Sequence, residues 1–247
     1  MLYLTGFHAI EERIKSGKTC GPLLLAKPGP RAREIVSLAQ ANKIRIDRTG
    51  VFELDHLAPD NRGIALQVNN IHADTAEIDL ETFLSSLGHK KDVLVIILDE
   101  ITDPHNYGAI LRSCDQFGVD LVISTKHRSA KNADVVSKTS AGAVSWVPQA
   151  ETPNLVRTAD QLKAAGFWVY GTDAHGEAVY SKNLQGRTAL VLGSEGAGIS
   201  RLLRERCDAM IGIPCLGRIS SLNVSVAAGV LLYEVRRQSY RDNNLHD

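Results

Sequence analysis

The sequence lacks any long hydrophobic run. The longest uninterrupted aliphatic stretch, VLVIIL at 93–98, has six residues, whereas a helix needs roughly 20 apolar residues to cross a bilayer. The chain also opens without a basic segment followed by a long apolar one, which is the pattern of a secretory signal. We therefore expect no membrane span and a cytoplasmic location.

Cysteine is scarce, and neither sign of charge is in excess. The four cysteines stand far apart with no CxxC pair, which argues against a disulfide framework and against a zinc site. The HExxH and Walker lysine motifs are also missing, so metalloprotease and P-loop chemistry are excluded and no metal is expected. The 28 basic and 28 acidic side chains cancel. A nucleic acid would therefore have to bind a local patch.

The composition that remains is typical of a folded protein with two units. Hydrophobic residues make up 44% of the chain and charged residues 23%. Residues 1–72 hold ten basic and seven acidic side chains, whereas 73–92 hold two basic and five acidic. The second segment also spaces Leu80, Phe83, Leu84 and Leu87 as in a short amphipathic helix. We therefore expect domains at 1–72 and 93–247, joined by a linker at 73–92.

Apolar periodicity predicts an α/β fold in both units. The first unit reads as helices at 8–15 and 31–42 with strands at 22–26 and 63–68. In the second, short apolar runs alternate with helical segments, which suits a mainly parallel sheet covered on both faces. These runs lie at 93–99, 120–124, 145–148, 167–173, 189–193 and 210–214, and a last helix is expected at about 222–237.

Three polar stretches follow expected strands, where α/β sheets place ligand-binding loops. The first, DPHNYG, begins at Asp103 and leads into a helix that carries Arg112. An amide at Asn106 and a guanidinium near a helix start suit a phosphate or ribose contact. The same residues equally fit a structural role, in which Asp103 or Asn106 caps the helix and Arg112 pairs with Asp115. The spacing leaves both interpretations open.

The second stretch is the glycine-rich LGSEGAG, which begins at Leu192. Its three glycines would let a ligand approach the backbone, and Glu195 is its only charge. The glycine spacing is not that of the dinucleotide fingerprint GxGxxG. Because glycine-rich turns without a ligand are common, this turn alone favours a structural role.

The third stretch, IPCLGRISSLNVS, begins at Ile213 and concentrates hydroxyls and an amide where the last helix begins. One of Ser220, Ser221 and Asn223 is expected to cap that helix. A Ser-His-Asp hydrolase has little support, because Ser194 lies in GSEG, not in GxSxG, and no histidine is positioned by sequence to serve it.

Together, DPHNYGAILRSCDQFGVD, LVLGSEGAG and IPCLGRISSLNVSVA resemble, in order and spacing, the three motifs of the SpoU/TrmH family of RNA ribose 2′-O-methyltransferases. The early GFHAI and the RGIA segment from Arg62 are similar to the small substrate-binding domain of the RlmB-type subgroup. The resemblance covers nearly the whole chain. It implies an N-terminal α/β substrate-binding domain and a C-terminal, mainly parallel α/β methyltransferase domain with a trefoil knot from about Ala189 onward.

The resemblance also implies S-adenosylmethionine as the cofactor, RNA as the substrate and a homodimer through the knotted domain, with no metal. The implied cofactor-binding positions are backbone around Gly193, Ile213 and Leu222, with Thr172, Leu192, Gly196 and Pro214 nearby. The positions that match the family's functional residues are Asn106, Arg112, Glu195, Ser221 and Asn223.

Arg112 is expected to act as an electrostatic clamp and not as a base. Arginine has a pKa above about 12 and stays protonated in proteins. We expect it to hold the phosphate next to the target ribose and to stabilise the developing 2′-alkoxide.

RNA contacts are expected from two basic clusters, each of which could equally be a solvated face. The cluster after the second strand of the C-terminal unit contains Lys126, His127, Arg128, Lys131 and Lys138, and the cluster in the small domain contains Lys27, Arg31 and Arg33.

The expected reaction is methyl transfer to the ribose 2′-hydroxyl of an RNA nucleotide. The leading candidate for that nucleotide is a guanosine of 23S rRNA. A tRNA methyltransferase of the same family, a non-catalytic RNA-binding ribosome assembly factor and a small-molecule nucleotide enzyme are the alternatives. Two departures from the family pattern, Tyr107 and Arg218, are expected to bear on substrate fit.

Overall fold

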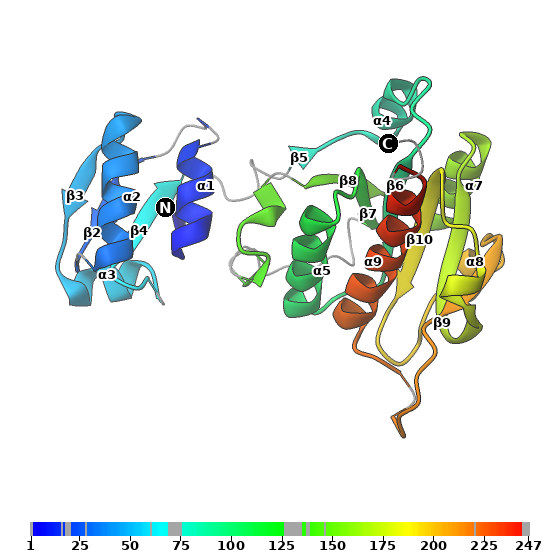
Figure 1. Cartoon of the computed structure of the whole chain (residues 1–247). Coiled ribbons are helices and arrows are strands. Elements are labelled where there is room, and N and C mark those ends of the chain that lie inside the picture. Colours follow the sequence, from blue (N-terminus) through cyan, green and yellow to red (C-terminus); the bar gives the residue numbers. More distant parts are fainter. Residues whose placement is uncertain are drawn as a thin grey trace.

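The chain folds into two α/β lobes, each built on its own sheet (Figure 1). The computed structural model describes residues 2–15, 17, 21–27, 29–59, 61–68, 76–125, 135–136, 139–145, 147–219 and 221–243. The expected fold class is confirmed, since a small α/β domain precedes a larger one with a parallel sheet. The trefoil knot and the domain boundaries stay predictions.

The N-terminal sheet has four short strands, in the order β1 (Leu2–Leu4), β4 (Ile64–Val68), β2 (Leu23–Leu25) and β3 (Ile46–Arg48). β4 runs antiparallel to β1 and β2, whereas β2 and β3 are parallel. Helices α1 (Phe7–Lys15) and α2 (Pro30–Ala41) bury Ile10, Ile14 and Ile35 against one face. The short helix α3 (Val51–Leu57) buries Leu54 against the other face.

The C-terminal sheet has seven strands, and every pair of neighbours is parallel. All residues of β6, which lies in the middle of this sheet, are buried. Alternate side chains of the strand face opposite faces of the sheet, and both faces are covered. The order is β11 (Ala209–Gly212), β9 (Trp168–Ala178), β10 (Arg187–Gly193), β6 (Val93–Asp99), β7 (Leu121–Thr125), β8 (Pro148–Thr152) and β5 (Ala76–Glu77).

Helices cover both faces of this sheet. α5 (Pro104–Gln116) and the long α9 (Val224–Asn243) pack on Leu94, Ile96 and Leu98 of β6. Packed against Val95 and Ile97, on the other face, are α4 (Leu80–Ser86), α7 (Leu155–Ala164) and α8 (Arg201–Arg204). The helix expected in the linker therefore exists as α4, and both α4 and β5 pack with the C-terminal sheet.

One expected strand lies elsewhere than predicted. Residues 145–148 were expected to be extended, but Ala143–Ser145 form a 3₁₀ turn, η2, and β8 begins only at Pro148. Val147, which lies in the expected strand, packs into the core of the α5 face, and Val144 of the turn packs against the same core. A second 3₁₀ turn, η3 (Val179–Ser181), follows β9.

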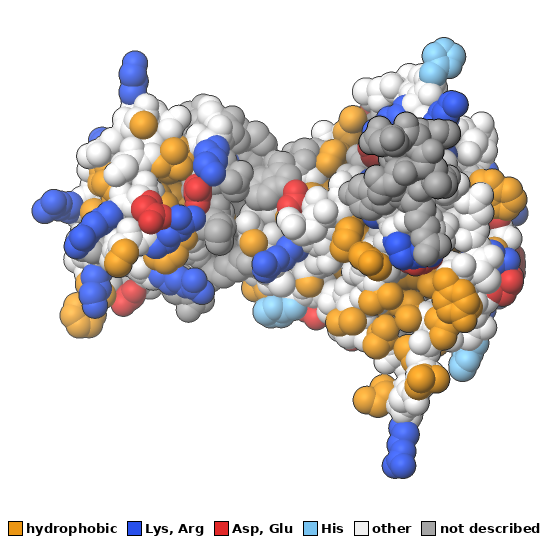
Figure 2. Space-filling model, viewed as in Figure 1, with side chains coloured by type: hydrophobic (Ala, Val, Ile, Leu, Met, Phe, Trp, Pro, Cys, Tyr) orange, Lys and Arg blue, Asp and Glu red, His pale blue; other side chains and the backbone are white. Residues whose placement is uncertain are grey.

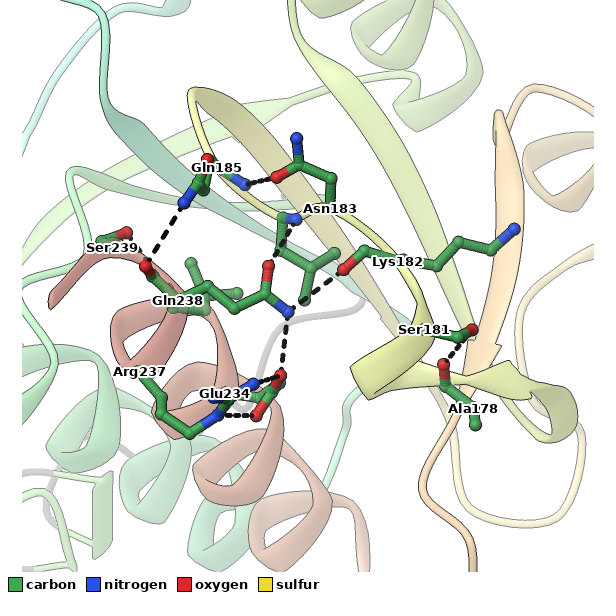
Figure 3. A network of polar contacts seen from close by, with 11 residues as sticks. Ala178, Ser181, Lys182, Asn183, Gln185, Glu234, Arg237, Gln238 and Ser239 are labelled. Carbon is green, nitrogen blue, oxygen red and sulfur yellow. Dashed lines mark hydrogen bonds and ion pairs between the residues drawn. The ribbon is translucent and has the colours of Figure 1, made fainter. Parts of the chain in front are cut away.

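A network of polar contacts fastens α9 to the segment between η3 and β10 (Figure 3). The amide of Gln238 donates to the carbonyl of Lys182 at 3.1 Å and accepts from the backbone N–H of Leu184 at 2.9 Å. It also donates to Glu234 at 2.8 Å, and Arg237 pairs with the same carboxylate at 2.6 Å. The hydrogen bond to Glu234 and the negative charge of that carboxylate raise the pKa of the Arg237 guanidinium. The Gln238 side chain thus gives hydrogen-bond partners to the Lys182 carbonyl and the Leu184 N–H, two backbone groups that lie outside the strands and helices.

We expect Gln238→Ala to destabilise the protein by about 2 kcal/mol, because it leaves the Leu184 N–H and the Lys182 carbonyl without their partner. For a chain of this size this corresponds to a fall in Tm of roughly 4–8 °C, measurable by thermal unfolding. Gln116→Ala is the matched control, since that exposed amide bonds to the neighbouring Asp115 and, among the described residues, to no other group. An equal fall in both variants would contradict the fastening role of Gln238.

Candidate functional site

The three polar stretches meet at one edge of the C-terminal sheet. β6 leads into α5, β10 leads into the glycine-rich turn, and β11 leads into the loop before α9. β11, β9, β10 and β6 are neighbours and run parallel, so their carboxyl ends lie on the same edge. This edge is where α/β sheets bind ligands.

One residue from each stretch joins a closed cluster of hydrogen bonds. Asn106 on α5 donates its Nδ2 to Glu195 Oε1 at 3.1 Å. Asn223, just before α9, donates its Nδ2 to the same Oε1 at 2.6 Å and to Asn106 Oδ1 at 3.0 Å. Asn106 is buried, with 9% of its surface exposed, while Glu195 and Asn223 lie at the surface. We call these three residues the amide–carboxylate cluster.

The cap of α9 fixes which way the amide of Asn223 points. Its Oδ1 accepts from the backbone N–H and the hydroxyl of Ser225, at 3.0 and 2.6 Å, and lies 3.4 Å from the N–H of Val226. The Nδ2 group must therefore face the cluster. Asn223 is therefore a cap of α9 and uses its Nδ2 group to hold Glu195. Ser220, also considered as a cap, lies outside the described residues.

The cap of α5 settles the two interpretations of the first stretch for Asn106. Asp103 caps this helix by accepting from the N–H of His105 at 3.0 Å, which leaves the Asn106 side chain free for the cluster. Arg112 lies exposed further along α5 and makes no ion pair or hydrogen bond with the residues that the structure describes. The alternative that Asp115 pairs with Arg112 is therefore not observed.

The glycine-rich turn closes on itself through backbone bonds. Ser194 and Gly198 exchange N–H to carbonyl bonds at 3.1 and 2.9 Å. A Cβ on Gly193 would stand only 2.2 Å from the carbonyl carbon of Gly198, so no side chain fits there. Gly196 has φ +90° and nothing within 4 Å of its Cβ position. A ligand can therefore reach the main chain of the turn.

Asp99 is a residue that the sequence interpretation missed. Its carboxylate is buried at the end of β6 and accepts from the N–H of Ser200 at 2.7 Å. This bond ties the strand that leads to Asn106 to the segment that follows the glycine turn. A carboxylate at the end of an otherwise apolar strand was the available signal.

The residues expected around the cofactor surround this turn at the same edge. Thr172 on β9 donates to the carbonyl of Val191 at 2.8 Å, and Leu192 is buried in the core, so Leu192 has only its backbone to offer. Ile213 and Pro214 follow β11 directly. Leu222 is exposed, as are Leu216 and Ile219 in the same loop.

Ser221 is exposed two residues before Asn223, and no hydrogen bond to the amide–carboxylate cluster is seen for it among the described residues. The structure therefore brings together three of the five expected catalytic residues. Ser221 and Arg112 lie outside that hydrogen-bonded set.

Tyr107 does not lie where the sequence interpretation expected it. Its ring is buried in the core of the α5 face, and its hydroxyl donates to Gln149 on β8 at 2.9 Å. Burial raises the pKa of this phenol to about 12. The expectation that Tyr107 bears on substrate fit is wrong, because the side chain serves packing between α5 and the sheet. Arg218 is exposed in the loop before α9.

The predicted RNA-contacting residues are only partly described. Arg31 pairs with Glu11 at 2.5 Å and also with Glu34, whereas Arg33 and Lys27 are exposed. The charge and hydrogen bond from these carboxylates raise the pKa of Arg31. Lys126, His127, Arg128, Lys131 and Lys138 lie outside the described residues.

In the part of the chain that the structure describes, no helix combines the length and the apolar character needed to cross a membrane. Within the same residues, no three histidine, cysteine, aspartate or glutamate side chains gather closely enough to hold a metal ion.

Comparisons with known proteins match both lobes. Residues 93–233 match the SpoU rRNA Methylase family, and residues 3–72 match the family RNA 2′-O ribose methyltransferase substrate binding. The 23S rRNA (guanosine-2′-O-)-methyltransferase RlmB of Neisseria meningitidis is 40% identical over 242 residues, which cover 96% of each chain. A putative TrmH family tRNA/rRNA methyltransferase of Staphylococcus aureus is 39% identical over 243 residues, again 96% of each.

A solved structure is similar over the same length. The SpoU methyltransferase AviRb from Streptomyces viridochromogenes, in complex with the cofactor AdoMet, superposes with a TM-score of 0.75 at 26% identity. The match covers 97% of this chain and 90% of that one.

Proposed function

Because the chain belongs to the SpoU family of RNA ribose 2′-O-methyltransferases, we propose that it methylates the 2′-hydroxyl of a guanosine in 23S rRNA. The methyl donor is S-adenosylmethionine. The observation on which the choice of rRNA rests is the 40% identity to an RlmB enzyme over 96% of both chains, substrate-binding domain included. The reaction belongs in the cytoplasm, where ribosomes are assembled.

The edge of the C-terminal sheet suits S-adenosylmethionine. The open main chain at Gly196 and the exposed apolar side chains of Ile219 and Leu222 suit a flat, largely apolar adenine with a polar rim. The residues proposed to hold the cofactor are Thr172, Leu192, Gly193, Gly196, Ile213, Pro214 and Leu222. When bound, S-adenosylmethionine supplies a methyl group on a positively charged sulfur, which is already activated for transfer.

The amide–carboxylate cluster is proposed to hold the reacting parts in line. Among the described residues, both hydrogen bonds to Glu195 use Oε1, which leaves Oε2 of this exposed side chain to accept a hydrogen bond from a substrate hydroxyl. Asn106 and Asn223 prevent that carboxylate from rotating. Alignment of this kind accounts for a large share of the rate when the donor is already activated. Ser221 is proposed as a further polar contact beside Asn223.

Arg112 is proposed to stabilise charge and not to accept the proton. Arginine side chains do not serve as bases in proteins, because the guanidinium group holds its proton. It is exposed and has no ion pair within the described residues, so it is available for the phosphate next to the target ribose and for the developing 2′-alkoxide. The hydroxyl proton then leaves to water or to the phosphate.

The homodimer is proposed to form through α9 and the loop before it. Val226, Val230 and Tyr233 recur at helical spacing and are exposed at 52%, 40% and 58%. Figure 2 shows hydrophobic side chains gathered over α9 and down onto that loop. An apolar face of this kind marks an interaction surface. Because Asn223 starts the same helix, each site would lie beside the interface.

We expect Val230→Glu to convert the dimer to a monomer, because a charge at the centre of an apolar interface loses its hydration without gaining a partner. Sedimentation equilibrium at micromolar concentration measures the mass. Leu202→Glu is the matched control, since Leu202 is exposed on α8, against the other face of the sheet. A dimeric Val230→Glu variant would place the interface elsewhere.

Two alternatives come from the chain's relatives and from its RNA-binding lobe. A tRNA substrate is the first, because the Staphylococcus aureus relative is described as a tRNA/rRNA methyltransferase. A non-catalytic assembly factor is the second, and it gives no reason for the chain to keep Asn106, Arg112, Glu195, Ser221 and Asn223 together.

Methyl transfer from labelled S-adenosylmethionine tests the proposal. Unmodified 23S rRNA and unmodified tRNA are offered separately, and alkali-resistant linkages are mapped, since these mark 2′-O-methylation. We expect label in one guanosine of the rRNA. Label in tRNA alone would keep the chemistry but overturn the substrate. Cofactor binding without label in either RNA would favour the assembly factor.

A further inference from the structure

The short helix α3 of the N-terminal domain presents an aromatic ring to solvent. Phe52 is 93% exposed, and its neighbour Val51 is 51% exposed. Burial of Leu54 and Ala58 already anchors this helix to the sheet. The Phe52 ring therefore contributes nothing to the core, although an exposed phenylalanine is among the least favoured surface residues.

Unpaired cations surround the same edge of the small sheet. β2 and β3 are parallel, and the N–H of Thr49, after β3, donates to the carbonyl of Leu25 at the end of β2. The strand ends thus bring Lys27 and Arg48 to the edge from which Phe52 projects. The N–H groups of Ala26 and Lys27 donate to the carbonyl of Gly63 at 2.9 and 3.2 Å, which brings Arg62 beside Lys27.

The first turn of α2 adds one more cation at this edge. Arg33 lies six residues after Lys27, on the helix that begins at Pro30. Lys27, Arg33, Arg48 and Arg62 are all exposed, and none has an ion pair with a described residue. Figure 2 shows lysine and arginine side chains spread over the N-terminal lobe.

The acidic groups nearby are already bound within the domain. Glu53, next to Phe52, accepts from the hydroxyl of Thr49 at 2.6 Å. Asp55 accepts from the amide of Asn61 at 2.6 Å. Glu34 pairs with Arg31. Glu53 and Asp55 bond to neutral groups and keep their charge, so the four cations Lys27, Arg33, Arg48 and Arg62 stand against two carboxylates, and the net charge of these described residues is positive.

We propose that Lys27, Arg33, Arg48, Phe52 and Arg62, which we call the Phe52 edge, bind an unpaired nucleotide of the RNA substrate. The base stacks on the Phe52 ring, and the cations contact the phosphates on either side. Stacking on an aromatic side chain accepts any base, and single-stranded loops and bulges are the parts of a folded RNA whose bases are free to stack. The proposal rests on the proposed function, since the RNA is the substrate of the methyl transfer.

The experiment measures binding of the full chain to the RNA that it methylates. We expect Phe52→Ala to raise Kd about tenfold, which corresponds to one lost base stack. Phe52→Trp keeps a ring and should restore the binding. Leu57→Ala removes an exposed apolar side chain from the same helix and should leave Kd unchanged.

The salt dependence of RNA binding distinguishes the contribution of the Phe52 ring from that of the cations. We expect Arg48→Gln and Arg62→Gln each to reduce the slope of log K against log salt concentration by about 0.7, the value for one single-strand phosphate. Phe52→Ala should lower affinity with no change in slope. At saturating RNA, all of these variants should keep the wild-type kcat, because none lies in the site on the other domain.

The outcomes distinguish this inference from the function on which it rests. If the wild-type chain methylates RNA and Phe52→Ala binds that RNA as tightly as wild type does, no base stacks on Phe52 and the proposal is overturned. If the wild-type chain methylates neither rRNA nor tRNA, the proposed function fails instead. A loss of affinity in Phe52→Ala that Phe52→Trp does not restore would overturn the stacking role.

Discussion

Arg112→Lys is expected to lower kcat by about 100-fold while leaving the fold intact. Lysine keeps the charge but loses the planar fork that holds two phosphate oxygens or a phosphate and the alkoxide together. Removing a group that stabilises charge in the transition state costs roughly 100- to 1000-fold. Single-turnover methylation at saturating RNA and cofactor measures the effect on the transfer step itself.

The control for this prediction is an arginine of similar exposure in a different place. Arg157 is exposed on α7, which packs on the other face of the sheet, and Arg157→Lys should turn over normally. Since Arg112 makes no contact with described residues through its charge, Tm should stay within the small change usual for surface substitutions. Near-normal turnover by Arg112→Lys would remove the proposed clamp.

Asn223→Ala is expected to damage both activity and stability. The substitution removes the bonds that Asn223 donates to Glu195 and Asn106 and leaves only the 3.1 Å bond between those two residues to orient them. We therefore expect kcat to fall about 100-fold, as when a positioning group is lost. It also removes the cap of α9, which costs about 1 kcal/mol. The corresponding fall in Tm is about 2–4 °C. Methyl-transfer kinetics and thermal unfolding measure the two effects separately.

Asn223→Asp separates those two effects. Aspartate caps a helix as well as asparagine does, so stability at low pH should stay close to that of the wild type. Its second oxygen then faces the Glu195 carboxylate where Nδ2 now lies at 2.6 Å. Two carboxylates this close raise the pKa of one of them. The two carboxylates share a proton at low pH and lose it as the pH rises through that raised pKa. Stability and activity depend on this proton, so both are present at low pH and fall as it is lost.

We therefore expect Asn223→Asp to be nearly inactive at pH 8 and to regain activity as the pH falls toward 5.5, relative to wild type at each pH. The measurement is kcat over that range, with Asn223→Ala as the reference that shows no regain. A profile for Asn223→Asp that runs parallel to the wild-type profile would show that Glu195 does not depend on the Nδ2 group.

The strands were predictable where burial leaves a continuous apolar run. Residues 93–99 match β6 at both ends because a strand at the middle of a covered sheet has no polar face. The strand predicted at 145–148 was wrong because Val147 packs into the core from the segment after a 3₁₀ turn, before β8 begins at Pro148. β1 and β3, with three residues each, were missed, whereas the equally short β2 was predicted because it lies in the apolar run PLLLA at 22–26.

The three members of the amide–carboxylate cluster were named from the sequence, but their hydrogen-bond pairing could not be predicted. The three polar stretches carried enough resemblance to name Asn106, Glu195 and Asn223. Their bonds join residues that are 89 and 117 positions apart, and no sequence spacing encodes such partners. They follow from the order of β11, β9, β10 and β6 in the sheet. The buried Asp99 was missed for the same reason, because its partner Ser200 is 101 residues away.

The place of Asn223 in the chain has a consequence for how the protein is made. The amide–carboxylate cluster takes its first member from α5 and its last from the start of α9, the final helix described. A chain still attached to the ribosome can complete the small domain and most of the parallel sheet before this helix has emerged. It cannot assemble the cluster until then. A growing chain therefore completes the domain that matches the substrate-binding family first and the amide–carboxylate cluster last.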